Sequence, residues 1–330
     1  MSIILEHPDA LIHIAELQGN KKRITISPLN KSVIIYTDQC ETFYPIWLIK
    51  QILDILGPAG LCDEIKRDEN ISNVEKSLKN HIFGYVNDVD FENKRILDFG
   101  CGGGASTMIL ARMFPKSNIV GVELVGKSLL IANCRLKHYG HTNVTFIRSP
   151  AGDSLPEQIG KFDFVILNGV YEHLLPNERK ILLPKIWTLI NPSGILFLVK
   201  IPYRYFPIET HTTGGLPFIN YFPDRMAFAL ARTFSKRLKR DESDNALLRK
   251  GIRGGSSGEI IGILEECHGK PLLMEPCKSG YTDKIDLWYA DSAYSKFPVI
   301  KVLLKFFFKI IKSTFGVTCL PYLSLAIKKQ

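Results

Sequence analysis

A regular alternation of short apolar runs and helical segments between residues 95 and 201 limits the folds open to this chain more than any other feature. The runs are rich in Val, Ile and Leu, as in parallel strands that are buried on both faces of a sheet. Helical segments separate them, as in right-handed strand–helix–strand crossovers. The pattern therefore predicts an α/β fold with a doubly wound, mainly parallel sheet. The expected strands are residues 95–99, 118–124, 144–149, 162–168 and 194–201, and the expected helices are residues 105–114, 126–138 and 177–190.

The sequence before residue 95 and after residue 201 predicts further strands and helices on either side of the core. Pro28-Leu-Asn30 lies between two β-like stretches, which predicts a hairpin of residues 22–26 and 32–36. Helices are expected over residues 45–56 and 72–85, with Gly57-Pro58 ending the first, and late strands over residues 271–276 and 318–328. We divide the chain into an N-terminal extension (1–80), an α/β core (81–201), an insertion or lid over the carboxyl ends of the strands (202–268), and the last strands of the core with a basic amphipathic helix (269–330).

The composition restricts the partners and the compartment of the protein. The chain has 42 Lys and Arg against 33 Asp and Glu, a formal charge of +9, which favours a nucleic acid, a membrane surface or an acidic small molecule. No apolar run reaches the length of a spanning helix, and residues 1–9 do not resemble a signal peptide. Seven cysteines without a C-x-x-C pair fit a reducing compartment. We therefore predict a cytoplasmic location.

A glycine-rich turn joins the first expected core strand to its helix and carries the strongest chemical signal. Gly100, Gly102 and Gly104 allow the backbone to approach a ligand closely, but this spacing alone also matches a dinucleotide-binding fingerprint. Asp98 separates the two interpretations, because a carboxylate is unfavourable beside a pyrophosphate and favourable beside a ligand with ammonium and sulfonium groups. Glu123 follows at the end of the next strand, where an acid can accept hydrogen bonds from ribose hydroxyls in either cofactor class.

Residues 95–200 resemble the Rossmann-like core of class I S-adenosylmethionine-dependent methyltransferases, whose first motif is an acid followed by G-x-G-x-G. Glu123 matches the family's acid after strand two, and Asp153 matches its acid after strand three, which contacts the adenine amino group. Residues 162–168 with the following Glu172-His173-Leu resemble the strand-four signature. The resemblance implies S-adenosyl-L-methionine as the cofactor. It implies the cofactor-binding residues Asp98, Gly100, Cys101, Gly102, Gly104, Glu123, Asp153 and Asn168.

Two of these residues also have a purely structural interpretation. Asp153 could cap a helical turn over residues 154–158, and it can do so while binding a ligand. Cys101 is interpreted as a small packed loop residue rather than a nucleophile, because no activating partner is visible.

His173 and His211 are the candidate general bases for an acceptor hydroxyl. His173 follows the fourth core strand, on the rim where ligands bind in open α/β sheets, and His211 lies in a polar stretch that ends in Gly214-Gly215. Both could instead be ordinary packing or surface residues. A divalent metal held by Glu172, His173, Glu209 and His211 is a weaker alternative, and we predict no metal.

The segment 298–312 predicts an amphipathic helix with lysines on one side and a broad apolar face. Such a helix fits the interface of a membrane, at its inner face for a cytoplasmic protein, whereas the alternative is a buried domain helix with one solvated stripe. The four lysines are Lys301, Lys305, Lys309 and Lys312.

The sequence as a whole favours a methyltransferase that acts on a small-molecule, glycan or lipid-linked acceptor, most simply on oxygen. An RNA or other nucleic-acid methyltransferase is the first alternative, disfavoured because residues 168–171 lack the motif of base-amine methyltransferases and no RNA-binding module is present. An NAD-dependent dehydrogenase, or a nucleotide-binding protein without turnover, is the second. Aromatic residues of the insertion fit an acceptor pocket and a packed core equally well; they are Tyr203, Tyr205, Phe206, Phe218, Tyr221 and Phe222.

Overall fold

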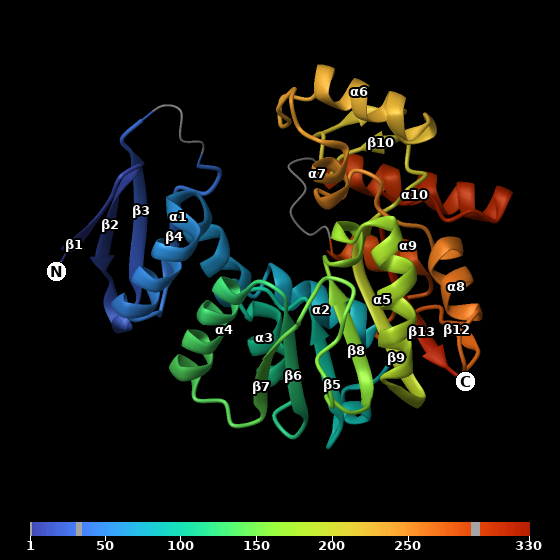
Figure 1. Ribbon diagram of the computed structural model, residues 1–330, viewed down its shortest axis with the longest axis horizontal. Helices are drawn as coiled ribbons and strands as arrows, with labels where there is room; N and C mark the ends of the chain where they lie inside the picture. The colour runs from blue at the N-terminus through green and yellow to red at the C-terminus, as the bar shows by residue number, and fades with distance from the viewer. Residues whose placement is uncertain (1, 31–34, 292–297) are drawn as a thin grey trace. The chain divides into compact units, whose positions relative to one another are not determined.

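The computed structural model describes residues 2–30, 35–291 and 298–330, and Figure 1 shows their course. The chain forms two compact units. The first unit contains residues 1–78 and 101–148, and the second contains residues 79–100 and 149–330.

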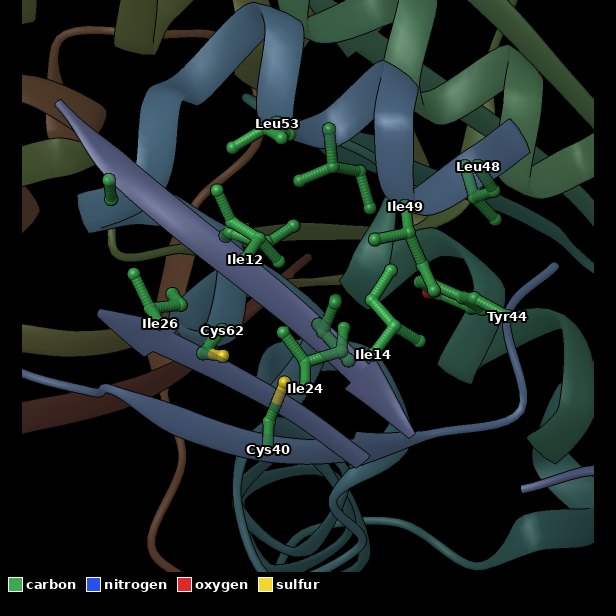
Figure 2. Packing of buried hydrophobic residues seen from close by; sticks show 14 of the residues in the cluster. Ile12, Ile14, Ile24, Ile26, Cys40, Tyr44, Leu48, Ile49, Leu53 and Cys62 are labelled. Carbon is green, nitrogen blue, oxygen red and sulfur yellow. The ribbon is translucent and has the colours of Figure 1, made fainter. Parts of the chain in front are cut away.

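The first unit begins with a four-stranded antiparallel sheet in the order β1-β2-β3-β4. Ile12, Ile14, Ile24 and Ile26 are buried and alternate with less buried residues, so one face of the sheet is apolar and buried. Figure 2 shows this face packed against α1, which contributes Leu48, Ile49 and Leu53 to the same cluster. The strands are β1 (Ser2–His7), β2 (Ala10–Glu16), β3 (Lys22–Pro28) and β4 (Gln39–Thr42), and α1 is Ile46–Glu69.

Two expectations for this region need correction. The expected hairpin pairs residues 22–26 with 32–36, but β3 pairs with Ala10–Glu16 and Gln39–Thr42. Residues 31–34 lie outside the described residues, and residues 35–36 are not in a strand. The expected break at Gly57 is present, with φ +70° and ψ 178°, but the helix resumes at once because Pro58 is well suited to the first turn of a helix.

The first unit also contains one strand–helix–strand crossover of the core. β6 (Asn118–Glu123) and β7 (Val144–Arg148) are parallel neighbours, joined through α4 (Gly126–Tyr139). α3 (Ala105–Met113) precedes β6 and follows the glycine turn directly. α1 packs against both α3 and α4, which connects the N-terminal sheet to the core helices of this unit.

The second unit contains the strand order β12-β13-β9-β8-β5. β5 (Arg95–Phe99), β8 (Phe162–Asn168) and β9 (Ile190–Pro202) are parallel, whereas β13 (Tyr322–Lys329) runs antiparallel to β9 and β12 (Pro271–Leu273). These pairings, together with the helices between successive strands, confirm the predicted α/β fold with a mainly parallel sheet.

Further elements of the second unit surround these strands. Within the expected insertion the structure has a short two-stranded hairpin and several helices. α7 contacts the short 3-10 turn Tyr171–His173 that follows β8. The remaining elements are α2 (Val74–Phe83), which joins the two units, α5 (Pro176–Thr188), β10 (Ile208–Glu209), β11 (Leu216–Pro217), α6 (Asp224–Phe234), α7 (Asp244–Arg249), α8 (Ser257–Glu265), α9 (Lys284–Asp291) and α10 (Pro298–Phe315).

Candidate functional site

The glycine turn is fixed to the end of β6 in the first unit. The Cys101 N–H donates a hydrogen bond to the Val122 carbonyl oxygen over 3.1 Å, and the Gly102 N–H donates to Glu123 Oε2 over 2.9 Å. Glu123 Oε1 accepts a second bond from the Val125 N–H at 2.8 Å. The acid predicted to bind ribose is therefore held beside Gly102. Cys101 is buried, with 5% exposure, as expected for a packed loop residue.

In the second unit, Asp98 and Asn168 lie near the same ends of two neighbouring parallel strands. Asp98 on β5 pairs in register with Ile166 on β8, and Asn168 is two residues further along β8. The Asp98 side chain is almost fully buried, and Gly100 follows it with φ +74°. A Cβ on Gly100 would lie 2.6 Å from Val170 Cγ2, so only glycine fits at this turn.

Asp153 does not cap a helix, because residues 149–161 contain turns and irregular backbone but no helix. Its side chain accepts a hydrogen bond from the Ser154 hydroxyl at 3.1 Å, and its backbone carbonyl oxygen accepts one from Lys185 Nζ at 2.8 Å. The capping interpretation of Asp153 is therefore wrong, and its carboxylate is half-buried in a loop after β7.

The two candidate bases come together in the second unit although they are 38 positions apart in the sequence. The rings of His173 and His211 lie 5.7 Å apart between centroids. Glu172 is beside them, and one potential ligand atom from each of the three residues lies within 4.8 Å of the other two. The distance from Glu172 Oε1 to His173 Nε2 is 3.9 Å. We name these residues the Glu172–His173–His211 cluster.

The environment of this cluster favours the uncharged forms of Glu172 and His211. Burial raises the pKa of Glu172 to about 7, since the side chain is 2% exposed and its Oε2 has no hydrogen-bond partner. Burial also lowers the pKa of His211, and the neighbouring His173 lowers it further. His173 Nδ1 lies 2.7 Å from the Arg249 carbonyl oxygen, which can only accept, so Nδ1 carries the proton and Nε2 presents a lone pair.

Glu209, the fourth residue of the metal alternative, is occupied elsewhere. Its carboxylate accepts hydrogen bonds from the backbone N–H groups of Thr212 and Thr213, at distances from 2.6 to 3.2 Å. It thereby closes the loop that carries His211. Glu209 is thus a residue that shapes the loop, and the cluster has three members rather than four.

Two residues near the predicted site have no clear signal in the sequence. Gly251 has φ +87°, and a Cβ there would lie 3.0 Å from His211 Cδ2 and 3.1 Å from Glu172 Cγ. Arg135, on α4, is fully buried and donates from Nη1 to the Gly103 carbonyl oxygen at 2.5 Å and to Glu64 Oε1 at 2.6 Å. For Arg135, the one signal in the sequence is the unusual occurrence of an arginine on the apolar face of a helix.

The aromatic residues of the insertion do not form a closed core. Tyr205, Phe218 and Tyr221 are each more than half exposed, and the Tyr221 hydroxyl donates to the Tyr205 carbonyl oxygen at 2.9 Å. Phe206 instead packs beside Phe308 of α10.

The basic helix α10 differs from the expectation of a buried helix with a solvated lysine stripe. Lys305 and Lys309 both lie 2.9 Å from Asp286 Oδ1, so the lysines face α9. The apolar stripe is the exposed one, at 62–69% for Val299, Leu303, Phe306 and Ile310. In the part of the chain that the structure describes, no helix has the length and apolar character needed to cross a membrane.

The comparisons with known proteins concern the central part of the chain. Residues 90–212 match the sequence model of a family described as a methyltransferase domain. An uncharacterized protein of Rickettsia prowazekii is 32% identical over 117 residues, which are 36% of this chain and 46% of the relative. The carboxy-S-adenosyl-L-methionine synthase of Shewanella baltica is 29% identical over 119 residues, 36% of this chain and 49% of the enzyme.

The similarity thus spans about half the length of the curated relatives. Among solved structures, PKMT2 from Rickettsia typhi in complex with AdoHcy is similar over 77% of this chain and 52% of that chain, at 17% identity and a TM-score of 0.45. The family match falls on the segment that carries the glycine turn, Glu123, Asp153 and the strand-four signature. Residues 90–212 are therefore similar to the family described as a methyltransferase domain, and the motifs in this segment resemble those of the class I S-adenosylmethionine-dependent family.

Proposed function

We propose that the chain transfers a methyl group from S-adenosyl-L-methionine to an oxygen atom of a small-molecule, glycan or lipid-linked acceptor. When bound, the cofactor supplies a sulfonium methyl group with a neutral leaving group. The observation that carries the proposal is the pair of hydrogen bonds that hold Glu123 against Gly102 and Val125. Each carboxylate oxygen keeps a further lone pair, so the residue is arranged to accept the two ribose hydroxyls.

The other predicted cofactor residues have complementary roles in the proposal. Asp98 and the turn of Gly100, Cys101, Gly102 and Gly104 bind the methionine end, Asp153 binds the adenine, and Asn168 is a further cofactor-binding residue. The buried position of Asp98 supports its role, because a carboxylate removed from water interacts more strongly with a cationic group. These assignments rest on the resemblance of the motifs and on the residue chemistry.

His173 and His211 are proposed to receive the proton of the acceptor hydroxyl. The hydrogen bond from His173 Nδ1 to the Arg249 carbonyl oxygen supports this role, because it leaves Nε2 as an acceptor and fixes the ring. The cluster follows the carboxyl end of β8, where ligands bind in open α/β sheets.

We also propose peripheral contact of residues 298–312 with a membrane, at its inner face for a cytoplasmic protein, which would give access to a lipid-linked acceptor. The exposed apolar stripe of α10 supports this contact. Lys305, Lys309 and Lys312 are already paired with Asp283 or Asp286, so the contact depends on apolar insertion more than on attraction to anionic lipids.

The acceptor class can be tested by adding the purified protein to a cell extract. The methyl donor in this reaction is S-adenosylmethionine that carries a labelled methyl group. Separation into lipid, glycan, small-molecule, RNA and protein fractions then shows where the label goes. Label in the lipid, glycan or small-molecule fraction supports the proposal. Label confined to the RNA fraction would establish the nucleic-acid alternative instead.

A further inference from the structure

The Glu172–His173–His211 cluster has the composition of a metal site with open coordination positions. Two imidazoles and one carboxylate are the protein ligands of several catalytic zinc sites and of facial-triad iron sites. Two ligand atoms on a tetrahedral zinc ion, each about 2.1 Å from the metal, are about 3.4 Å apart. The 3.9 Å between Glu172 Oε1 and His173 Nε2 is about half an ångström longer, which a small side-chain rotation closes.

The orientation of His173 supports metal binding independently of the spacing. Metal-binding histidines commonly donate their second ring N–H to a carbonyl or carboxylate, which orients the ring and presents the other nitrogen to the metal. His173 Nδ1 makes such a bond, at 2.7 Å, to the Arg249 carbonyl oxygen. Its Nε2 faces the Glu172 carboxylate.

The buried carboxylate of Glu172 provides the second observation. The side chain is 98% buried and its Oε2 has no hydrogen-bond partner among the described residues. Its titratable neighbours within the cluster are the two histidines, whereas outside the cluster the buried Arg179 attracts the carboxylate and Glu209 is occupied by Thr212 and Thr213. A buried carboxylate with one oxygen that has no hydrogen-bond partner is costly, and a cation at the cluster would reduce that cost.

The backbone at Gly251 leaves room for the side chains of the cluster. Gly251 adopts φ +87°, and the space that its Cβ would occupy is 3.1 Å from both His211 Nε2 and Glu172 Cγ. Any other residue would enter the cluster itself. The loop closed by Glu209 holds His211 on the other side, so three segments distant in sequence converge on the same position.

We infer that Glu172, His173 and His211 bind one divalent transition-metal ion of the zinc type, with the remaining coordination positions open to water or to a hydroxyl oxygen of an acceptor. In the metal-bound protein the imidazole nitrogens are ligands and not bases, so this inference replaces the proton-accepting role proposed above for His173 and His211. Binding of the ion does not depend on methyl transfer itself, so metal binding and methyltransferase activity are tested separately.

Zinc binding to the full chain tests this inference. The protein, free of any affinity tag and stripped with a chelator, is titrated with Zn²⁺ in competition with a chromogenic chelator. Co²⁺ is added in a parallel titration, because its visible absorption reports the ligand set without any enzymatic assay. We expect one ion per chain, and a Co²⁺ spectrum typical of four or five ligands.

Variants make the test specific. Glu172→Gln preserves the shape of the side chain, and we expect it and His211→Ala to weaken Zn²⁺ binding by about 100-fold. His268→Ala removes an exposed histidine elsewhere in the same unit and should leave the affinity unchanged. Circular dichroism checks that each variant is folded. If a variant of a buried residue unfolds, the Zn²⁺ affinity of His173→Ala is measured instead, because the side chain of His173 is 45% exposed. Equal Zn²⁺ affinity in wild type and His173→Ala, or no stoichiometric binding by the wild type, overturns the inference.

Discussion

Glu123 Oε2 accepts a hydrogen bond from the backbone N–H of Gly102, 2.9 Å away, so the acid after β6 and the glycine turn form one hydrogen-bonded element. The second oxygen is held by the Val125 N–H. Two donors on two different oxygens fix the plane of the carboxylate. A ligand that bonds to this carboxylate thus meets a preorganised group, and little side-chain entropy is lost on binding.

Replacement of Glu123 tests the ribose role. Glu123→Ala should weaken the binding of S-adenosylhomocysteine by about 1.5–3 kcal/mol, because charged hydrogen bonds to the ribose are lost. Isothermal titration calorimetry measures the affinity. Asp54→Ala, which removes an exposed acid on α1, serves as the control and should bind as the wild type does. Unchanged affinity in a folded Glu123→Ala protein would remove Glu123 from the cofactor site.

Arg135 is predicted to be a stabilising residue of the first unit and a support of the glycine turn. It donates to Glu64 and to the Gly103 carbonyl oxygen, and it lies 3.6 Å from the buried Asp68. Arg135→Met leaves these acids without their buried cation, so we expect a loss of about 3–5 kcal/mol in the free energy of unfolding. Urea denaturation measures it, with exposed Lys127→Ala on the same helix as the control. A loss below about 1 kcal/mol, the scale of an exposed ion pair, contradicts this role.

The exposed stripe of α10 predicts binding to lipid vesicles. We expect the protein to sediment with phosphatidylcholine vesicles, and the bound fraction to change little on addition of salt, because Lys305, Lys309 and Lys312 of α10 are paired within the protein. Leu303→Asp combined with Phe306→Asp should abolish binding, whereas Ile71→Asp, at another exposed apolar residue, should not. Equal binding of the double variant and the wild type refutes membrane contact through α10.

The contact between α9 and α10 should depend on pH. Burial tends to raise the pKa of Asp286, but hydrogen bonds from Thr282, Lys305 and Lys309 outweigh it and lower the pKa below its usual value. A carboxyl group with a lowered pKa stabilises the folded state above its unfolded pKa of about 3.9, and this stabilisation decreases as the pH falls below that value.

Trp288 can report the loss of this contact, because its ring lies 5.1 Å from Phe308 of α10. We expect the fluorescence of Trp288 to change as the pH falls below about 4. Asp286→Asn should show the altered signal already at neutral pH, and its freed lysines should make vesicle binding sensitive to anionic lipid. A wild-type signal in Asp286→Asn at pH 7 contradicts the prediction. Trp47→Phe and Trp187→Phe, introduced together, remove the other tryptophans from the measurement.

The core of the fold was predictable because its elements are defined by local patterns. β5 and β8 have the predicted bounds, and α3, α4, β6 and β7 differ by a residue at an end. The N-terminal sheet was not predictable, since the packing of β1, β2 and β3 depends on α1 covering their apolar face. Alternation in a single short strand is a weak signal without its neighbours.

The site was predictable only as far as residue chemistry and sequence order reach. The glycine turn and Glu123 are joined by a local loop, and the sequence spacing is enough to bring them together. The approach of His211 to His173 is set by the insertion, whose path depends on Glu209, on Gly251 and on the contact of α7 with the turn after β8. None of these tertiary contacts has a periodic signature, so the three-residue cluster emerges only in the folded chain.

Calorimetric titration of the wild-type chain with S-adenosylhomocysteine, and separately with NAD, tests the central claim most directly. The account predicts saturable binding of one S-adenosylhomocysteine per chain and no detectable heat with NAD. Saturable binding of NAD, with no response to the thioether, would contradict it and assign the glycine turn to a redox coenzyme.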